Sequence, residues 1–202
     1  MFLPAISQKD TRTKVLISTT FGDITIVLYD ETPKHKENFI KLVKEGYFDS
    51  LLFHRVISEF MIQGGDPDSK NAAPGVMLGN GGPSYTVPVE VKAGLIHKKG
   101  ALAGARKPDN LNSSGSQFYI VQGRKFTIEE LDLYAKQMGK PFTPQQIEAY
   151  TTIGGAPHLD GGYTVFGDVI AGLDVLDKIA AVQVDKNKRP LKDVVMTMKI
   201  IN

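Results

Sequence analysis

The amino-acid sequence predicts a mainly β domain whose short strands form a closed antiparallel barrel or a sandwich, with helices covering it and one helical hairpin inserted. Short β-rich runs outnumber helical ones, Gly, Asn and Pro separate them at close spacing, and only one long segment breaks this rhythm. The 202 residues are 42% hydrophobic and 23% charged, as in ordinary globular proteins. At roughly 100–200 residues per domain, we expect a single domain over residues 1–202.

The first predicted elements are a hairpin and a helix. The β-rich runs 14–20 and 23–29 are separated by a Phe-Gly pair, and this glycine supplies the positive φ that a tight turn needs. Thr32 and Pro33 then fit the N-cap and the first residue of a helix, which Gly46 ends.

The rest of the chain alternates strands with loops. A stretch rich in Gly, Asn and Pro from residue 71 to 88 reads as loop. Its residues 79–83 lack the Lys-Ser/Thr pair of a phosphate-binding loop, so we expect a mobile loop there. A short helix is predicted over 173–180, and further strands over 51–57, 60–63, 100–105, 117–121, 164–170 and 194–201.

Residues from about 125 to 156 form the segment that breaks the β rhythm, and they predict a helical hairpin between two strands. Thr127 followed by Glu130 is a capping box, and residues 143–146 are a second helix N-terminal signature. Two interpretations remain open: a surface cover for one opening of the barrel, or a device that binds a partner. As a cover, the hairpin should be replaceable by a short turn that leaves a folded, active core.

Composition and charge exclude several classes of protein. The 24 basic and 22 acidic residues leave a net charge of +2, which is no basic stripe for nucleic acid. The absence of cysteine excludes disulfides, thiolate zinc sites and cysteine nucleophiles. No run reaches the roughly 20 apolar residues of a membrane helix, so we expect no membrane span. The apolar start, residues 1–6, is too short for a signal peptide. We therefore expect a cytoplasmic protein, or a periplasmic or secreted one if a leader has been trimmed.

The sequence also gives no support for metal, nucleotide or serine-hydrolase chemistry, so we expect no metal and no cofactor. His35, in the first turn of the first helix among charged residues, is expected on a solvated face. No serine lies in the G-x-S-x-G motif of hydrolases. No two histidines have the i, i+4 spacing of a helical zinc site; the four are His35, His54, His97 and His158.

One charged side chain stands out against this background. Period-two alternation over residues 51–57 places Arg55 on the same face as Phe53 and Ile57. A charge at an apolar wall needs a partner or a purpose. The periodicity alone leaves open whether Arg55 pairs with a carboxylate such as Asp66, extends into solvent, or acts on a substrate.

Four sequence blocks resemble the cyclophilin family of peptidyl-prolyl isomerases. The blocks follow one another in the family's order from about residue 14 to 201, interrupted mainly by the helical insert. They are E-T-P-K with E-N-F over 31–39, F-H-R-V-I with F-M-I-Q-G-G-D-P over 53–67, S-G-S-Q-F-Y-I over 114–120, and L-D-G-G-Y-T-V-F-G over 159–167.

The resemblance implies a closed eight-stranded antiparallel barrel with helices at its two ends and an outer groove that binds an extended Xaa-Pro segment. In this assignment Arg55 is the catalytic arginine, Gln63 orients its guanidinium, and His54 is structural. The substrate-binding residues that the resemblance implies are Phe60, Met61, Ala105, Arg106, Gln117, Tyr119, His158, Leu159 and Tyr163.

Three positions depart from the family pattern. His158 stands where many members carry Trp, Tyr163 where many carry His, and Tyr119 where the second aromatic of S-Q-F-F is expected. These changes keep bulk at the pocket rim, and the loss of Trp predicts weak binding of cyclosporin. The resemblance also implies proline-containing peptides and unfolded proteins as partners, for which the chain would act as a chaperone-like folding helper. We expect the protein to be a monomer.

Two functions of different classes compete. The first is an active prolyl isomerase. The second is a module that binds proline-containing segments without catalysis. Arg55, Gln63 and Phe60 together favour the first, because a mere binder has no need of a donor aimed at the prolyl nitrogen.

Overall fold

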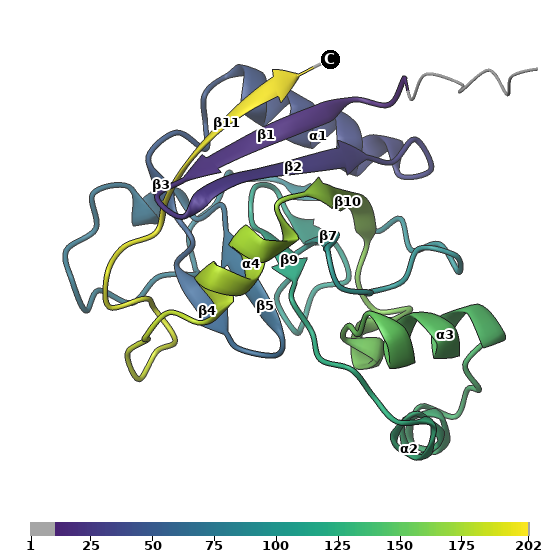
Figure 1. The fold of residues 1–202 in the computed structure, drawn as a ribbon. Coiled ribbons are helices and arrows are strands. Elements are labelled where there is room, and N and C mark those ends of the chain that lie inside the picture. Colours follow the sequence, from purple (N-terminus) through teal and green to yellow (C-terminus); the bar gives the residue numbers. More distant parts are fainter. Residues whose placement is uncertain (1–10, 202) are drawn as a thin grey trace, which may run out of the picture.

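The computed structural model describes residues 11–201, so the apolar start lies outside the described residues. Figure 1 shows a strongly curled antiparallel sheet with α1 against one side and α2 and α3 together at another. The four α-helices are α1 (Pro33–Lys44), α2 (Ile128–Met138), α3 (Pro144–Thr152) and α4 (Leu173–Ala180); two 3-10 turns are η1 (Pro67–Ser69) and η2 (Pro157–Leu159). Within this part of the chain no helix is both long and apolar enough to cross a bilayer.

The main sheet has nine strands in the order β3-β11-β1-β2-β10-β7-β9-β5-β4, and β6 pairs with β8 separately. The hairpin predicted near the start is confirmed, because β1 and β2 pair antiparallel across a turn with Gly22 at φ +124°. The strands are β1 (Lys14–Thr19), β2 (Gly22–Leu28), β3 (Leu51–Leu52), β4 (Arg55–Ile57), β5 (Met61–Gly64), β6 (Thr86–Val87), β7 (Ala101–Gly104), β8 (Ser113–Ser114), β9 (Phe118–Val121), β10 (Val165–Ala171) and β11 (Val195–Ile201).

The sheet corrects the prediction of a closed eight-stranded barrel. The segment 51–57, predicted as one strand, breaks at Phe53 and His54 into β3 and β4. These two strands pair with different partners, β11 and β5, and so form the two edges of one curled sheet. The break also corrects the alternation argument. Phe53 is fully buried in the core, whereas Arg55 is exposed on the outside.

The core fills the inside of this curl. Helix α1 contributes Phe39, Leu42 and Val43. The ring of Phe39 meets the ring of Phe118 edge-on, with the ring centroids 5.6 Å apart. Helix α4 packs against the same core through Val175, among others. The opposite, outer surface of β5, β7 and β9 carries a separate apolar cluster. The candidate site lies at this cluster.

The N-terminus of α1 differs from its prediction. Thr32 occupies the N-cap position, but its side chain makes no capping hydrogen bond. Instead the carboxylate of Glu90 accepts the backbone N–H groups of Lys34 and His35 at 3.1 and 3.0 Å. His35, expected on a solvated face, is 3% exposed, with Nδ1 2.7 Å from Glu90 and Nε2 2.9 Å from the hydroxyl of Ser113. That expectation was wrong because a loop distant in sequence covers this helix turn.

The predicted helical hairpin is present as α2 and α3, and both helices begin with a capping box. Its two stems meet, since the N–H of Gly155 donates to the carbonyl of Arg124 at 3.0 Å. A Cβ on Gly123 would lie 2.4 Å from the Cα of Gly155, so the close approach of the stems requires glycine. Tyr150 and Leu131 are buried in a small cluster of the insert's own.

Candidate active site

A cavity of about 360 Å³ opens on the outer face of the sheet. It brings together all the predicted site residues except Gln117 and His158, and adds residues that the sequence analysis did not select. Its lining consists of His54, Arg55, Phe60, Met61, Gln63, Met77, Leu78, Gly79, Asn80, Ala105, Arg106, Tyr119, Leu159 and Tyr163.

Strand register explains why these side chains meet. Gln63 in β5 pairs directly with Arg55 in β4 on one side and with Tyr119 in β9 on the other, and Tyr119 pairs with Ala103 in β7. Directly paired residues point to the same face of a sheet. One row of side chains therefore crosses four strands on the outer surface, while Ile62 alternates into the core.

A directional chain of hydrogen bonds holds the guanidinium of Arg55. Nη1 of Arg55 donates to Oε1 of Gln63 at 3.1 Å, and Nε2 of Gln63 donates to Oε1 of Gln117 at 2.9 Å. Nε2 of Gln117 in turn donates to the carbonyl oxygens of Gly79 and Gly81 at 3.0 and 2.7 Å. Gln117 thus orients Gln63, and it lines a second cavity that adjoins the first.

The glycine-rich loop at 79–81 is fixed from the other side by Asp66. This fully buried carboxylate accepts the N–H of Gly79 and, at 3.4 Å, that of Gly81. A Cβ on Gly81 would lie 2.2 Å from Oδ1 of Asp66, which explains the glycine. The loop, expected to be mobile, is held by hydrogen bonds on both sides. Because Asp66 binds this loop, it is not the partner of Arg55. The ion pair between Asp66 and Arg55, which the sequence pattern had left open, is therefore excluded.

Arg55 carries its charge without a counter-ion. Among residues 11–201 no carboxylate oxygen lies within 4.0 Å of its guanidinium. Partial burial lowers the pKa of Arg55 from its usual range, but an arginine so placed remains protonated near neutral pH. Among the described residues, the side chain that hydrogen-bonds to it is the neutral amide of Gln63.

The floor of the cavity is apolar. Met61, Tyr119 and Leu159 are 1%, 5% and 9% exposed, and Phe60 is half-buried at the edge. His54 completes one wall, and its burial lowers its pKa to about 4, so its ring is neutral near pH 7. A recess with an apolar floor, a neutral histidine in one wall and the arginines Arg55 and Arg106 beside it is suited to a small ring that carries no charge.

The other predicted residues lie at the rim. The guanidinium of Arg106 stacks over the ring of Tyr163 at 4.4 Å and donates to the carbonyl of Gly162 at 3.0 Å, so this side chain builds the wall. His158 is exposed outside the cavity, with its ring 5.3 Å from Phe60 and 6.5 Å from Tyr134 of α2.

Sequence reasoning missed the loop residues 77–80 and, behind Tyr119, the side chains of His97 and Asp160. Only Asp160 had a signal, as part of the L-D-G block. His97 lies in a segment without periodicity or motif. Among the described residues no three His, Cys, Asp or Glu side chains gather in a way that could hold a metal ion.

Comparisons with known proteins agree with this arrangement. Residues 14–200 match the sequence model of the family described as cyclophilin type peptidyl-prolyl cis-trans isomerase/CLD. A Staphylococcus epidermidis protein named "Putative peptidyl-prolyl cis-trans isomerase" is 40% identical over 193 residues, which cover 93% of this chain and 91% of that protein. A Streptococcus pyogenes protein named "Putative bifunctional phosphatase/peptidyl-prolyl cis-trans isomerase" is 40% identical over 195 residues. This chain spans only 38% of its length.

Among solved structures, similarity extends to a cyclophilin type peptidyl-prolyl cis-trans isomerase of Cryptosporidium parvum, crystallised in the presence of the dipeptide Ala-Pro. The TM-score is 0.70 at 26% identity, and the match covers 94% of this chain and 99% of that one. The nearly complete match to the family and the relative of similar length lead to one conclusion. The chain belongs to the cyclophilin-type peptidyl-prolyl cis-trans isomerases.

Proposed function

We propose that this isomerase binds the proline ring of an Xaa-Pro segment in the outer cavity and that Arg55 donates a hydrogen bond to the prolyl nitrogen as the amide twists. The observation that carries the proposal is the guanidinium of Arg55, which no carboxylate neutralises among residues 11–201 and which a neutral amide holds beside a cavity with an apolar floor.

Rotation about a peptide bond needs no bond to be made or broken. Its barrier of ~18–20 kcal/mol comes from resonance, and uncatalysed prolyl isomerisation takes tens of seconds. Reaching an ordinary turnover rate requires a reduction of about 3–7 kcal/mol. In the twisted state the nitrogen is pyramidal and regains its lone pair. A donor aimed at that lone pair therefore stabilises the twisted state more than either planar state, which is the condition for catalysis.

The residues around Arg55 suit this role. The amide of Gln63 fixes the guanidinium without neutralising it, as a carboxylate would. Met61, Tyr119 and Leu159 seat the pyrrolidine ring and keep water from it, and in such a low-dielectric site the field of the arginine is stronger. The ring stays in place while the carbonyl that precedes it turns.

The proposed substrates are Xaa-Pro segments of peptides and unfolded proteins. Support comes from the Ala-Pro dipeptide named with the Cryptosporidium parvum structure. A second cavity of about 260 Å³ adjoins the first, shares Gln63, Ala105 and Arg106 with it, and gives an extended chain room to continue.

Exchange NMR on a short Xaa-Pro peptide tests the role of Arg55. Arg55→Ala should lower kcat by about 10²–10³, the usual cost of removing one preorganised donor. Arg55→Lys, which keeps the charge but not the planar fork, should recover only part of that loss. Unchanged backbone NMR spectra would show that the fold is intact.

Near-wild-type exchange in Arg55→Ala would contradict the assignment of Arg55. If the wild-type chain binds the peptide without accelerating exchange, the chain is a binding module rather than a catalyst.

A further inference from the structure

The hydroxyl of Tyr119 begins a buried chain of hydrogen bonds that leads away from the cavity. Its oxygen lies 3.0 Å from Nε2 of His97, whose side chain is 0% exposed. Nδ1 of His97 lies 2.9 Å from Oδ1 of Asp160. The other oxygen of Asp160 accepts the hydroxyl of Tyr150 at 2.5 Å and Nε2 of Gln146 at 3.0 Å. The chain therefore joins strand β9 to helix α3.

The charge of Asp160 fixes the direction of the hydrogen bonds at the centre of this chain. Burial by itself raises the pKa of Asp160, but hydrogen bonds from His97 and Tyr150 lower it overall, so the group is a carboxylate that only accepts. Nδ1 of His97 must then donate to this carboxylate, and Nε2 on the other side of the same ring holds the hydroxyl of Tyr119 at 3.0 Å. Burial raises the pKa of both tyrosines, so each hydroxyl keeps its proton.

The far end of the chain is fixed by packing. Tyr150 is fully buried, and its ring meets Phe142 edge-on at 5.9 Å. Just beyond α3, the N–H of Ala156 donates to the carbonyl of His97 at 2.8 Å. A Cβ on Gly155 would lie 2.3 Å from that carbonyl oxygen, so the approach depends on glycine. The end of the insert thus rests directly on the residue that contacts Tyr119.

We propose that His97 and Tyr150 are positioning residues for the isomerase reaction. Acting through Asp160, they fix the ring of Tyr119 in the cavity wall, which makes helix α3 part of the active-site architecture. The inference rests on the proposed function, because the position of this ring matters only if the cavity seats the proline.

Ring packing alone does not prevent every motion of the Tyr119 ring, and its hydrogen bond with His97 restrains the remaining motion. The ring meets Tyr163 edge-on at 6.0 Å, and it lies nearly parallel to the ring of His97 with the centroids 6.1 Å apart. The contact with Tyr163 restrains its tilt but not its sliding within its own plane. The bond from its hydroxyl to Nε2 of His97 restrains that sliding. If the hydrogen bond from Tyr150 in α3 to Asp160 is removed, Asp160 and His97 are held less firmly. The ring of Tyr119 can then shift from its position in the cavity wall.

A double-mutant cycle over Tyr119→Phe and Tyr150→Phe tests this coupling, since each change removes a hydroxyl and keeps the ring. The readouts are kcat and KM for an Xaa-Pro peptide by exchange NMR, and urea unfolding in parallel. Tyr150→Phe should lower kcat/KM about five- to tenfold in the wild-type background. In the Tyr119→Phe background it should lower kcat/KM less than about twofold, because the hydroxyl to be positioned is gone.

Tyr47→Phe is the matched control, since it removes another partly buried hydroxyl, which donates to Ser116 at 3.4 Å and packs against the core inside the curl rather than against the cavity. Its kcat/KM should equal that of the wild type. If Tyr150→Phe does not fold, Gln146→Glu replaces it, because it keeps the capping acceptor for Thr143 and places a second carboxylate against Asp160.

Equal losses of kcat/KM in the two backgrounds, or no loss in either, would overturn the proposal. The result is independent of Arg55→Ala, which by itself decides whether the proposed catalytic role of the arginine holds.

Discussion

At the scale of single residues, the site depends on what surrounds Arg55. The side chain is exposed on one side, yet its position is set by a chain of amides that ends on the carbonyl groups of Gly79 and Gly81. An amide accepts a hydrogen bond without adding charge. A carboxylate in the place of Gln63 would form an ion pair and reduce the field that the arginine directs at the substrate.

The variant Gln63→Glu should therefore lower kcat by about tenfold at pH 7.5, the equivalent of ~1.4 kcal/mol. Gln63→Met removes the same hydrogen bond without adding a charge and serves as the comparison. It should lower kcat less, by about threefold. Exchange NMR with one Xaa-Pro peptide measures both variants, and a Glu variant as active as the Met variant would show that charge at this position is unimportant.

His158 sets a second residue-scale prediction, which concerns cyclosporin. The resemblance to the family implies that a Trp at this place packs on the drug and offers an indole N–H. Burial is the main cause that lowers the pKa of His158, so its ring is neutral at pH 7.5 and lacks only area and a well-placed donor. We expect weak binding by the wild type and about tenfold tighter binding by His158→Trp, the equivalent of ~1.4 kcal/mol.

Calorimetric titration of both proteins at pH 7.5 measures this difference. Catalysis should hardly change in the variant, because the ring of His158 lies outside the cavity beside Phe60. Equal dissociation constants would show that another part of the rim controls the drug.

At the scale of elements, α1 depends on a cap from elsewhere in the chain. The carboxylate of Glu90 accepts two N–H groups of the first turn and contacts the ring of His35. A negative charge at a helix N-terminus is favourable through the dipole as well as through these bonds. Because α1 carries Phe39 and Leu42 into the core, the cap supports the packing of the sheet too.

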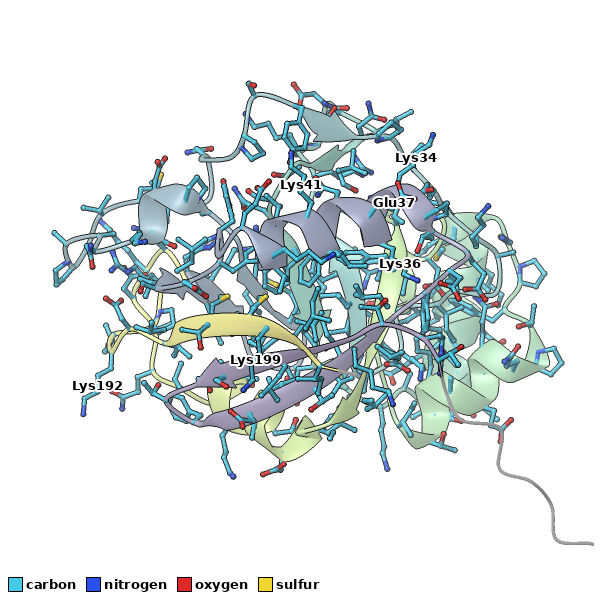
Figure 2. The ribbon with its side chains drawn as sticks, turned by 90° about the horizontal axis from the view of Figure 1, so that it is seen from above. Lys34, Lys36, Glu37, Lys41, Lys192 and Lys199 are labelled. Carbon is cyan, nitrogen blue, oxygen red and sulfur yellow. The ribbon has the colours of Figure 1, made fainter. Side chains whose placement is uncertain are left out.

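Glu90→Gln should lower the free energy of unfolding by about 1–2 kcal/mol, since it removes the charge and one acceptor. The matched control is Glu37→Gln on the same helix. Figure 2 shows Glu37 beside Lys34 and Lys41 on the outward side of α1, so its loss should change stability by less than about 0.5 kcal/mol. Urea unfolding checks both, and equal effects would rule out Glu90 as the cap.

The helical insert gives a further element-scale prediction. Replacing residues 126–153 with a short Gly-containing turn should leave a folded sheet, because the stems already meet at Arg124 and Gly155. From the sequence alone we predicted that this core would also be active. The structure shows that Tyr150 contacts Asp160 and that Tyr134 contacts His158. We therefore expect kcat/KM of the deletion variant to fall by about fivefold or more. Unchanged activity in a folded deletion variant would show that the insert is only a cover.

At the scale of the whole molecule, buried histidines make stability depend on pH. The pKa of His54 is about 4 in the folded protein, well below the ordinary 6.5. The unfolded chain therefore binds this proton more tightly than the folded one. The stability that His54 contributes is complete above about pH 6.5 and is lost as the pH falls toward 4.

This one group should lower the free energy of unfolding by about 2–3 kcal/mol between pH 7.5 and pH 4.5. Urea unfolding of wild type and His54→Gln at the two pH values isolates it, because the difference between the proteins should shrink by that amount at low pH. A constant difference would show that His54 titrates normally in the folded state.

Local patterns predicted much of this fold. The β1–β2 hairpin, the start of α1 at Pro33 and the paired capping boxes of the insert all follow from turn glycines, fixed φ angles and side-chain caps within a few residues. The motif blocks also selected residues that the cavity brings together, among them Arg55 and Gln63. Such features depend on neighbours in sequence, so the sequence alone is enough to identify them.

What the tertiary structure alone decided involves partners far apart in the chain. The split of 51–57 between two sheet edges, the cap of α1 by Glu90, and the link from Tyr119 through His97 to Tyr150 leave no periodic trace, because each joins segments that meet only once the sheet has curled. Burial then determines their chemistry. The imidazoles of His35 and His97 and the hydroxyl of Tyr150, withdrawn from water, find their partners across the fold, and no local pattern specifies which partner each one meets.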